Sequence, residues 1–166
     1  MEIKNNIKKH LNEFVTSKTV NENSLKDFNI SDDDLLEILK GYLESALWTE
    51  EERLEDEYKE MFDYSEDIDL NYITVDDLDD NSKIQAYIDI KNFIINSGED
   101  AIREAIDVNG LFKLGMDIWL TRNRHGAGFF DHNYEHEKEL INSAHNLKEV
   151  DLYFGDDMKL YFSNIQ

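Results

Sequence analysis

The chain contains no cysteine and no proline, and only seven of its 166 residues are glycine. Without cysteine there can be no disulfide, no cysteine nucleophile and no thiolate metal site. Because proline is absent and glycine is rare, no stretch has the composition of an interdomain linker. The sequence also lacks a run of about 18 apolar residues and an apolar signal-peptide segment, so we expect no membrane span and a cytoplasmic location.

Positive charge is scarce as well, and the net charge is −21. Residues 1–31 carry a net charge of +1, residues 32–80 contain 20 acidic and three basic side chains, and residues 81–166 carry −5. A negative field of this size repels nucleic acids and anionic membranes and attracts basic proteins. We therefore expect a basic protein partner, with no direct binding to nucleic acid or membrane.

What the chain does contain is core material, since 40% of its residues are hydrophobic and 11% are aromatic. This composition is too apolar for a disordered chain, and the length is that of one domain. We predict a single α+β domain, in which N-terminal helices are followed by a small antiparallel sheet. Its predicted parts are an N-terminal helix and connector (1–31), an acidic helical and irregular region (32–80), and a helix plus small sheet (81–166).

Apolar residues at helical spacing predict the helices, and polar residues before them predict the N-caps. Ser31 is the predicted cap of the second helix, and Asn81 or Ser82 that of the fourth. The Asn109-Gly110 pair is typical of a helix end. The predicted helices are 2–17, 32–48, one that begins near Thr49 and ends near Phe62, 83–96 and 99–108; residues 63–80 are expected to be irregular.

Beyond Gly110 the apolar pattern alternates, which indicates strands. We predict a strand over 116–121, a tight turn at Gly126-Ala127-Gly128 and a return strand through Phe129 and Phe130. A helix over 134–147 follows. Val150, Leu152 and Phe154 then alternate with polar residues, Gly155-Asp156-Asp157 forms a turn, and Leu160 and Phe162 lie on the returning strand of a hairpin.

One segment resembles a family of small, uncharacterised proteins of tailed bacteriophages. It reads Trp119-Leu120-Thr121-Arg122-Asn123-Arg124-His125-Gly126-Ala127-Gly128-Phe129-Phe130-Asp131. The family pattern is Trp-Leu-Thr-Arg-Asn-Gly-His-Gly-Ala-Gly-Phe-Trp-Asp, with an upstream Ala-Leu-Trp and a downstream Tyr-x-Gly-Asp-Asp. Here these are Ala46-Leu47-Trp48 and Tyr153-Phe154-Gly155-Asp156-Asp157, while Arg124 and Phe130 depart from the pattern. The resemblance implies a phage origin and the cytoplasm of an infected bacterium, but no activity.

The same segment is the first candidate site. Backbone N–H groups in a glycine-rich turn can form a nest for an anion, and arginine side chains bind phosphate or carboxylate. The residues of this predicted anion site are Arg122, Asn123, Arg124, His125, Gly126 and Gly128. The alternative is a purely structural turn, in which Arg122 pairs with Asp131. In a second functional hypothesis the turn belongs to a small enzyme, with His125 and Asp131 as the acid and base groups.

Metal sites are weaker alternatives, and we expect no cofactor. His125, Asp131, His132 and His136 are suitable ligand types, but their spacing matches no known metal signature. The acidic residues that follow Asp63 have the odd-position spacing of a calcium loop. However, Ile68 stands where that loop needs glycine, and Thr74 where it needs glutamate.

The acidic block is the second candidate site. Its carboxylates could imitate nucleic acid phosphates and bind the basic groove of a host nucleic-acid-handling protein, or they could simply keep the protein soluble. The predicted partner-binding residues are Asp32, Asp33, Asp34, Trp48, Glu51, Glu55, Asp56, Tyr58, Asp63, Tyr64, Asp67 and Asp69, with Phe62 as a further apolar anchor. We favour an inhibitor of this kind over the enzyme and over a structural or oligomerisation module, and the oligomeric state stays open.

Overall fold

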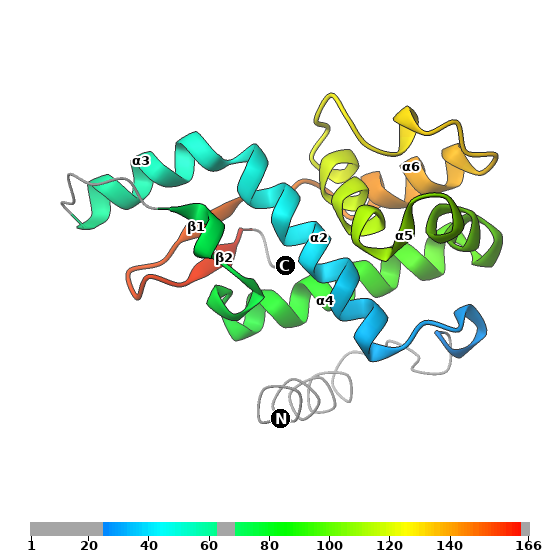
Figure 1. Ribbon diagram of the computed structural model, residues 1–166, viewed down its shortest axis with the longest axis horizontal. Helices are drawn as coiled ribbons and strands as arrows, with labels where there is room; N and C mark the ends of the chain where they lie inside the picture. Colours follow the sequence, from blue (N-terminus) through cyan, green and yellow to red (C-terminus); the bar gives the residue numbers. More distant parts are fainter. Residues whose placement is uncertain (1–24, 63–68, 164–166) are drawn as a thin grey trace.

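A computed structural model describes residues 25–62 and 69–163, and it shows the predicted α+β class, with N-terminal helices and a small C-terminal sheet. Figure 1 shows α2, α4, α5 and α6 gathered into a bundle, with α3 leading away from it above a β-hairpin. The predicted helix over 2–17 lies outside the described residues. The helices are α2 (Asp32–Thr49), α3 (Glu51–Phe62), α4 (Asp80–Ser97), α5 (Glu99–Arg122) and α6 (Glu137–Asn146), and the strands are β1 (Leu152–Phe154) and β2 (Leu160–Phe162).

Local capping chemistry sets the start of α2. The Ser31 hydroxyl accepts a hydrogen bond from the Asp34 N–H, and the Asp34 carboxylate accepts one from the Ser31 N–H, which completes the capping box. The prediction for this helix is confirmed. The predicted cap of α4 was wrong, because Asp79 accepts hydrogen bonds from the N–H groups of Asn81 and Ser82, and these two residues lie inside the helix.

The centre of the bundle is the crossing of α2 and α5, where two glycines let the backbones touch. A Cβ atom on Gly41 would lie 1.8 Å from the carbonyl oxygen of Phe112, and one on Gly115 would lie 1.9 Å from that of Ile38. Any larger residue would force the helices apart. Trp119 of α5 fills the space next to the crossing, edge-on to Tyr42 at a centroid distance of 5.1 Å.

The predicted strand over 116–121 is wrong, since these residues belong to α5. The helix is interrupted at Gly110, with φ 80° and ψ 172°, so the helix end predicted there is a kink after which the helix resumes. Asp117, Trp119 and Thr121 alternate with Ile118 and Leu120 in the sequence, but all five are buried. The second half of α5 is enclosed almost all round, and its sequence therefore shows no clear helical period.

The predicted return strand at Phe129 and Phe130 is also wrong, because a short 3-10 helix spans Phe129–Asp131. Phe129 is fully buried and stacks on Phe93 at 5.4 Å, whereas Phe130 is exposed. The terminal hairpin is confirmed, with β1 and β2 antiparallel and Tyr153 opposite Tyr161. The outer edge of β2 is covered by a parallel bridge between Leu78 and Leu160.

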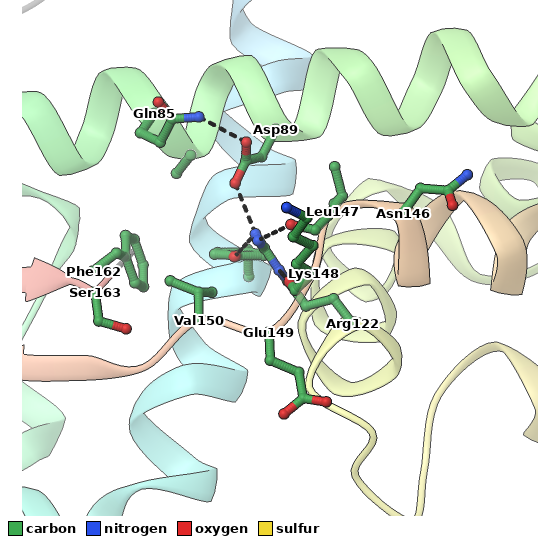
Figure 2. A pocket seen from close by; sticks show the side chains of 12 residues that line it. Gln85, Asp89, Arg122, Asn146, Leu147, Lys148, Glu149, Val150, Phe162 and Ser163 are labelled. Atoms are coloured by element: carbon green, nitrogen blue, oxygen red, sulfur yellow. Dashed lines mark hydrogen bonds and ion pairs between the residues drawn. The ribbon is translucent and has the colours of Figure 1, made fainter. Parts of the chain in front are cut away.

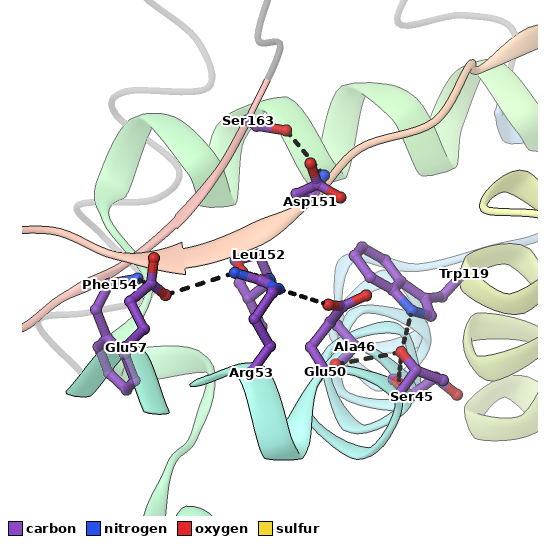
Figure 3. A network of polar contacts seen from close by, with 11 residues as sticks. Ser45, Ala46, Glu50, Arg53, Glu57, Trp119, Asp151, Leu152, Phe154 and Ser163 are labelled. Carbon is purple, nitrogen blue, oxygen red and sulfur yellow. Dashed lines mark hydrogen bonds and ion pairs between the residues drawn. The ribbon is translucent and has the colours of Figure 1, made fainter. Parts of the chain in front are cut away.

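Side chains of α3 cover the outer edge of β1, as Figure 3 shows. The Arg53 guanidinium donates to the carbonyl oxygen of Leu152, and the Glu57 carboxylate accepts from the Phe154 N–H at 3.3 Å. Arg53 and Glu57 also pair with each other at 3.6 Å. The two side chains thus take the place of a neighbouring strand, and they fix α3 to the hairpin.

None of the helices in the described ranges combines the length with the apolar run needed to cross a bilayer.

Candidate functional site

Arg122, the central residue of the predicted anion site, is buried at the end of α5 with 3% of its surface exposed. Its guanidinium donates to the Tyr42 hydroxyl at 2.6 Å, to the Asp89 carboxylate at 2.8 Å, and to the carbonyl oxygens of Leu147 and Lys148 at 2.9 Å each. These bonds use four of the five N–H groups of the side chain. Arg122 pairs with Asp89, so the predicted pairing with Asp131 was wrong.

The charges around Arg122 compensate one another. Burial opposes the guanidinium charge, but Tyr42 and Asp89 outweigh it and raise the pKa of Arg122. Burial also raises the pKa of Tyr42 to about 12, against the opposing effect of Arg122. The second Asp89 oxygen accepts from the Gln85 amide at 2.8 Å. Arg122 therefore ties α2, α4 and the segment after α6 together.

A pocket of about 400 Å³ opens beside this network. Figure 2 shows Asp89 and Gln85 on one wall and the 146–150 segment on the other, with the Arg122 guanidinium directed into the network between them. Since the guanidinium is already bonded to protein atoms, it has little capacity left for an external anion. The pocket is lined by Tyr42, Gln85, Ala86, Asp89, Arg122, Asn146, Leu147, Lys148, Glu149, Val150, Phe162 and Ser163.

The other side chains of the predicted anion site point to different partners. Asn123 accepts a hydrogen bond from the Val150 N–H at 2.8 Å, and the exposed Arg124 pairs with Glu149 at 3.0 Å. His125 Nε2 is buried, and none of the described residues offers it a hydrogen bond. The structure therefore does not gather these side chains around one ligand position.

Three backbone donors around the glycine turn are also occupied internally. The Gly128 N–H donates to the Asp131 carboxylate at 2.9 Å, and the Phe129 N–H donates to the Thr121 hydroxyl at 3.1 Å. The His125 N–H donates to the carbonyl oxygen of Leu120. Asp131 thus supplies the negative charge that a nest would bind, and the geometry favours the structural turn over an anion or catalytic site.

The histidines form two separate pairs with carboxylates. His132 Nε2 lies 3.0 Å from Asp117, which is fully buried, and Lys113 contacts the other Asp117 oxygen at 2.5 Å. Burial raises the pKa of Asp117, against the opposing effects of Lys113 and His132. Sequence patterns could suggest only the Lys113 contact, because it is four residues away on one helix.

The second pair joins His136 to Glu104 at 2.9 Å. Burial opposes the Glu104 charge, but hydrogen bonds from the N–H groups of Glu135 and His136 and from the imidazole lower the pKa of Glu104. The same imidazole–carboxylate bond raises the pKa of His136. Across the described ranges, no three histidine, aspartate or glutamate side chains are arranged to hold a metal ion.

The carboxylates of the acidic block lie at separate places within the described ranges, so they do not form one continuous binding surface. Asp32, Asp33 and Asp34 begin α2, at the end of that helix remote from α3 (Figure 1). Several acidic residues serve as helix caps and face their own backbone. These caps are Asp34, Asp69, Asp77 and Asp79. Of the predicted partner-binding residues, Asp63, Tyr64 and Asp67 lie outside the described ranges.

The charge that remains together is on α3. This helix of 12 residues has six acidic and two basic side chains, hence a net charge of −4. Leu54 is fully buried and Tyr58 packs edge-on to Phe154 at 5.6 Å, so this face looks toward the hairpin. At 100° per residue, the opposite face carries Glu52, Asp56 and Glu60, all of which are exposed. By the same rotation Glu55 lies at the edge of this face, and Glu51 lies nearer the side of Tyr58 but is exposed because it begins the helix.

Trp48 stands at the junction of α2 and α3 with 63% of its surface exposed. Glu44 precedes it by one helical turn on α2, and Glu51 and Glu52 follow it at the start of α3, so this exposed indole has acidic neighbours on both sides along the chain. We refer to Trp48 together with Glu51, Glu52, Glu55, Asp56 and Glu60 as the acidic face. Trp48, Glu51, Glu55 and Asp56 were predicted from the sequence, whereas Glu52 and Glu60 were missed. The i, i+4 spacing of the α3 helix could have added both.

Comparison of the chain with protein-family models, with curated proteins and with solved structures gave no match.

Proposed function

We propose that this protein is a non-catalytic binding protein whose acidic face docks against a basic surface of a nucleic-acid-handling protein and inhibits it. The observation that carries this proposal is the placement of α3, which leads away from the bundle with its apolar side on the hairpin and its carboxylates outward (Figure 1). An outward helix with one sign of charge attracts a partner of the opposite sign and speeds its association.

The charge density of α3 supports the comparison with nucleic acid. Its net charge of −4 is distributed over about 18 Å of helix axis, or about one charge per 4.5 Å. A nucleic acid strand carries about one charge per 3.4 Å and a duplex about one per 1.7 Å. The charge spacing of α3 is thus closer to that of a single strand than to that of a duplex, and the expected target is a groove that accommodates single-stranded nucleic acid.

Beyond the first turn, where the helix dipole favours Glu51 and Glu52, the acidic face does not serve the stability of its own helix. Glu51 and Glu55, Glu52 and Asp56, and Asp56 and Glu60 are like-charge pairs at i, i+4 spacing. Each such pair destabilises a helix by roughly 0.2–0.5 kcal/mol. A cluster of carboxylates that costs stability while the hairpin contacts hold the helix in place is better explained by binding than by folding.

Trp48 gives the surface an apolar anchor. Exposed tryptophans at interfaces are enriched among the residues whose truncation weakens binding most, and truncation of such an anchor typically costs about 2 kcal/mol or more. Trp48→Ala should therefore weaken the complex by roughly 30-fold. The resemblance to tailed-bacteriophage proteins makes a protein of the bacterial host the expected partner.

The test is affinity capture from bacterial lysate at low salt, with two matched variants. The variant E52Q/D56Q/E60Q removes three charges from the acidic face. The control D107N/E135Q/E139Q removes three exposed charges from α5, the segment before α6 and α6 itself, at the other end of the molecule. We expect the wild type and the control to capture the same basic nucleic-acid-handling protein, and the acidic-face variant to capture at least about tenfold less of it.

Two further measurements on the captured complex complete the test. High salt and a single-stranded oligonucleotide should each release the captured protein, because both compete for its basic groove. Equal loss of capture in both charge variants, or a complex that is insensitive to salt, would reject the proposed function.

A further inference from the structure

A second pocket lies on α2, close to Trp48. It has a volume of about 420 Å³ and is walled by α2, by the 73–76 segment and by the first residues of α5 after the kink. Its lining is mainly apolar. The lining residues are Leu36, Lys40, Leu43, Glu44, Leu47, Ile73, Thr74, Val75, Asp76 and Phe112.

The walls of this pocket are held in place by contacts that also stabilise the fold. Leu43 and Leu47 belong to the buried core, and the backbone of Phe112 is held at the Gly41 crossing while its side chain stays 38% exposed. The 3-10 helix Val75–Asp77 starts with a capping box between Thr74 and Asp77. The pocket is therefore preformed, and binding would cost little ordering of its walls.

The rim of the pocket is acidic. Glu44 and Asp76 both line it, and Trp48 follows Glu44 by one helical turn. Lys40, the basic lining residue, pairs with Glu37 at 3.3 Å. A pocket with an apolar floor and carboxylates around it is complementary to an apolar side chain of a partner when the surrounding partner segment is positively charged.

We propose that this pocket receives apolar side chains, such as leucine, from a lysine- or arginine-rich segment of the protein that the acidic face binds. The inference rests on the proposed function and adds the recognition element of the partner. The volume falls in the range of small ligand sites, about 300–1,000 Å³, which suits one or two side chains. A second copy of this chain is a poor occupant, because its net charge of −21 repels the same rim.

The test uses two synthetic peptides and the full chain. The first is a short lysine-rich peptide with two leucines three residues apart, and the second has serine in place of both leucines. Because burial of a leucine side chain contributes about 1.5–3 kcal/mol, the wild type should bind the leucine peptide at least about tenfold more tightly. Fluorescence anisotropy measures both affinities.

Variants separate the pocket from the acidic face. Phe112→Asn and, independently, Val75→Asn should abolish the preference for leucine and leave the serine peptide bound as before. Val108→Asn, at an exposed apolar position outside the pocket, should change neither affinity. The acidic-face variant E52Q/D56Q/E60Q should weaken both peptides alike and keep the preference. Thermal unfolding of each variant verifies that the fold is intact.

The possible failures are distinguishable. Equal affinity of the wild type for both peptides overturns the pocket proposal and leaves the proposed function standing. A leucine preference that persists while E52Q/D56Q/E60Q has no effect on either peptide supports the pocket and rejects the proposed function.

Two other occupants would also overturn the inference. If I7S/L11S in the full chain tightens binding of the leucine peptide, the chain's own N-terminal segment occupies the pocket. If light scattering shows a dimer that Phe112→Asn dissociates, a second copy occupies it.

Discussion

The helix bundle and α3 differ in whether their charged side chains are paired inside the fold or exposed to solvent. In the bundle, the buried Arg122 is bonded on several sides and is neutralised by Asp89. On α3, Glu52, Asp56 and Glu60 face solvent next to one another, and the basic Arg53 is directed to the hairpin instead. The difference separates charge that is neutralised within the fold from charge that is left on the surface, where the proposed function uses it.

The largest effect should come from the charge network of the bundle. Arg122→Met would leave the Asp89 carboxylate and the Tyr42 hydroxyl without their partner in a largely buried place. Removal of one member of a buried ion pair typically costs about 3–5 kcal/mol. We expect a loss of this size in urea unfolding, and the double variant R122M/D89L should recover part of it. A loss under about 1 kcal/mol would show that the bundle tolerates an unpaired charge and would break the contrast.

The next effect concerns the crossing of α2 and α5. Gly115→Ala should destabilise the protein by about 1–3 kcal/mol or more, because the added Cβ would overlap the Ile38 carbonyl. Gly126 is the matched control, since a Cβ there has no heavy atom within 4 Å. Gly126→Ala should leave the melting temperature nearly unchanged. Similar melting temperatures for the two variants would mean that the crossing can open without cost.

On α3, substitution of charged residues should increase the stability of the protein rather than reduce it. The variant E52Q/D56Q/E60Q removes two of the like-charge i, i+4 pairs, so it should stabilise the protein by up to about 1 kcal/mol at low salt. The gain should shrink as salt screens the carboxylates. A melting temperature that falls in this variant would show that the carboxylates support the fold, and the proposed function would lose its energetic argument.

The parts of the fold that sequence could predict are those with local causes. The Ser31 cap, the α3 helix and the terminal hairpin depend on residues only a few positions apart, and all three were correctly predicted. The second half of α5 was mistaken for a strand because its burial is imposed by other elements. A helix surrounded on all sides loses the polar face from which its period could be recognised.

The candidate sites show the same limit. The partners of Arg122 are Tyr42 and Asp89, at distances of 80 and 33 residues along the chain, and no local pattern connects them. The acidic residues of the block could be counted from the sequence, but a count does not show which way each side chain points. Only the structure shows that Asp34 closes a helix end while Asp56 faces solvent.

The smallest effect is a pH dependence at the partly buried pair of Glu104 and His136. This pair differs both from the buried Arg122 network and from the exposed carboxylates of α3. The His136 pKa is raised from 6.5, so its contribution to stability is present below pH 6.5 and is lost as the pH rises through the folded-state pKa. The Glu104 pKa is lowered from 4.5, so its contribution is present above pH 4.5 and is lost as the pH falls through the folded-state pKa. Both contributions are therefore present together between pH 4.5 and 6.5.

Two variants separate these contributions in melting curves recorded from acid to alkaline pH. His136→Gln should lower the melting temperature below pH 6.5 and lose its effect as the pH rises, because the wild-type imidazole then becomes neutral. Glu104→Gln should remain destabilising at alkaline pH, since the carboxylate still accepts the N–H groups of Glu135 and His136. If the His136→Gln difference is constant with pH, the pair acts as a neutral hydrogen bond, and paired charge in this protein is confined to sites like that of Arg122.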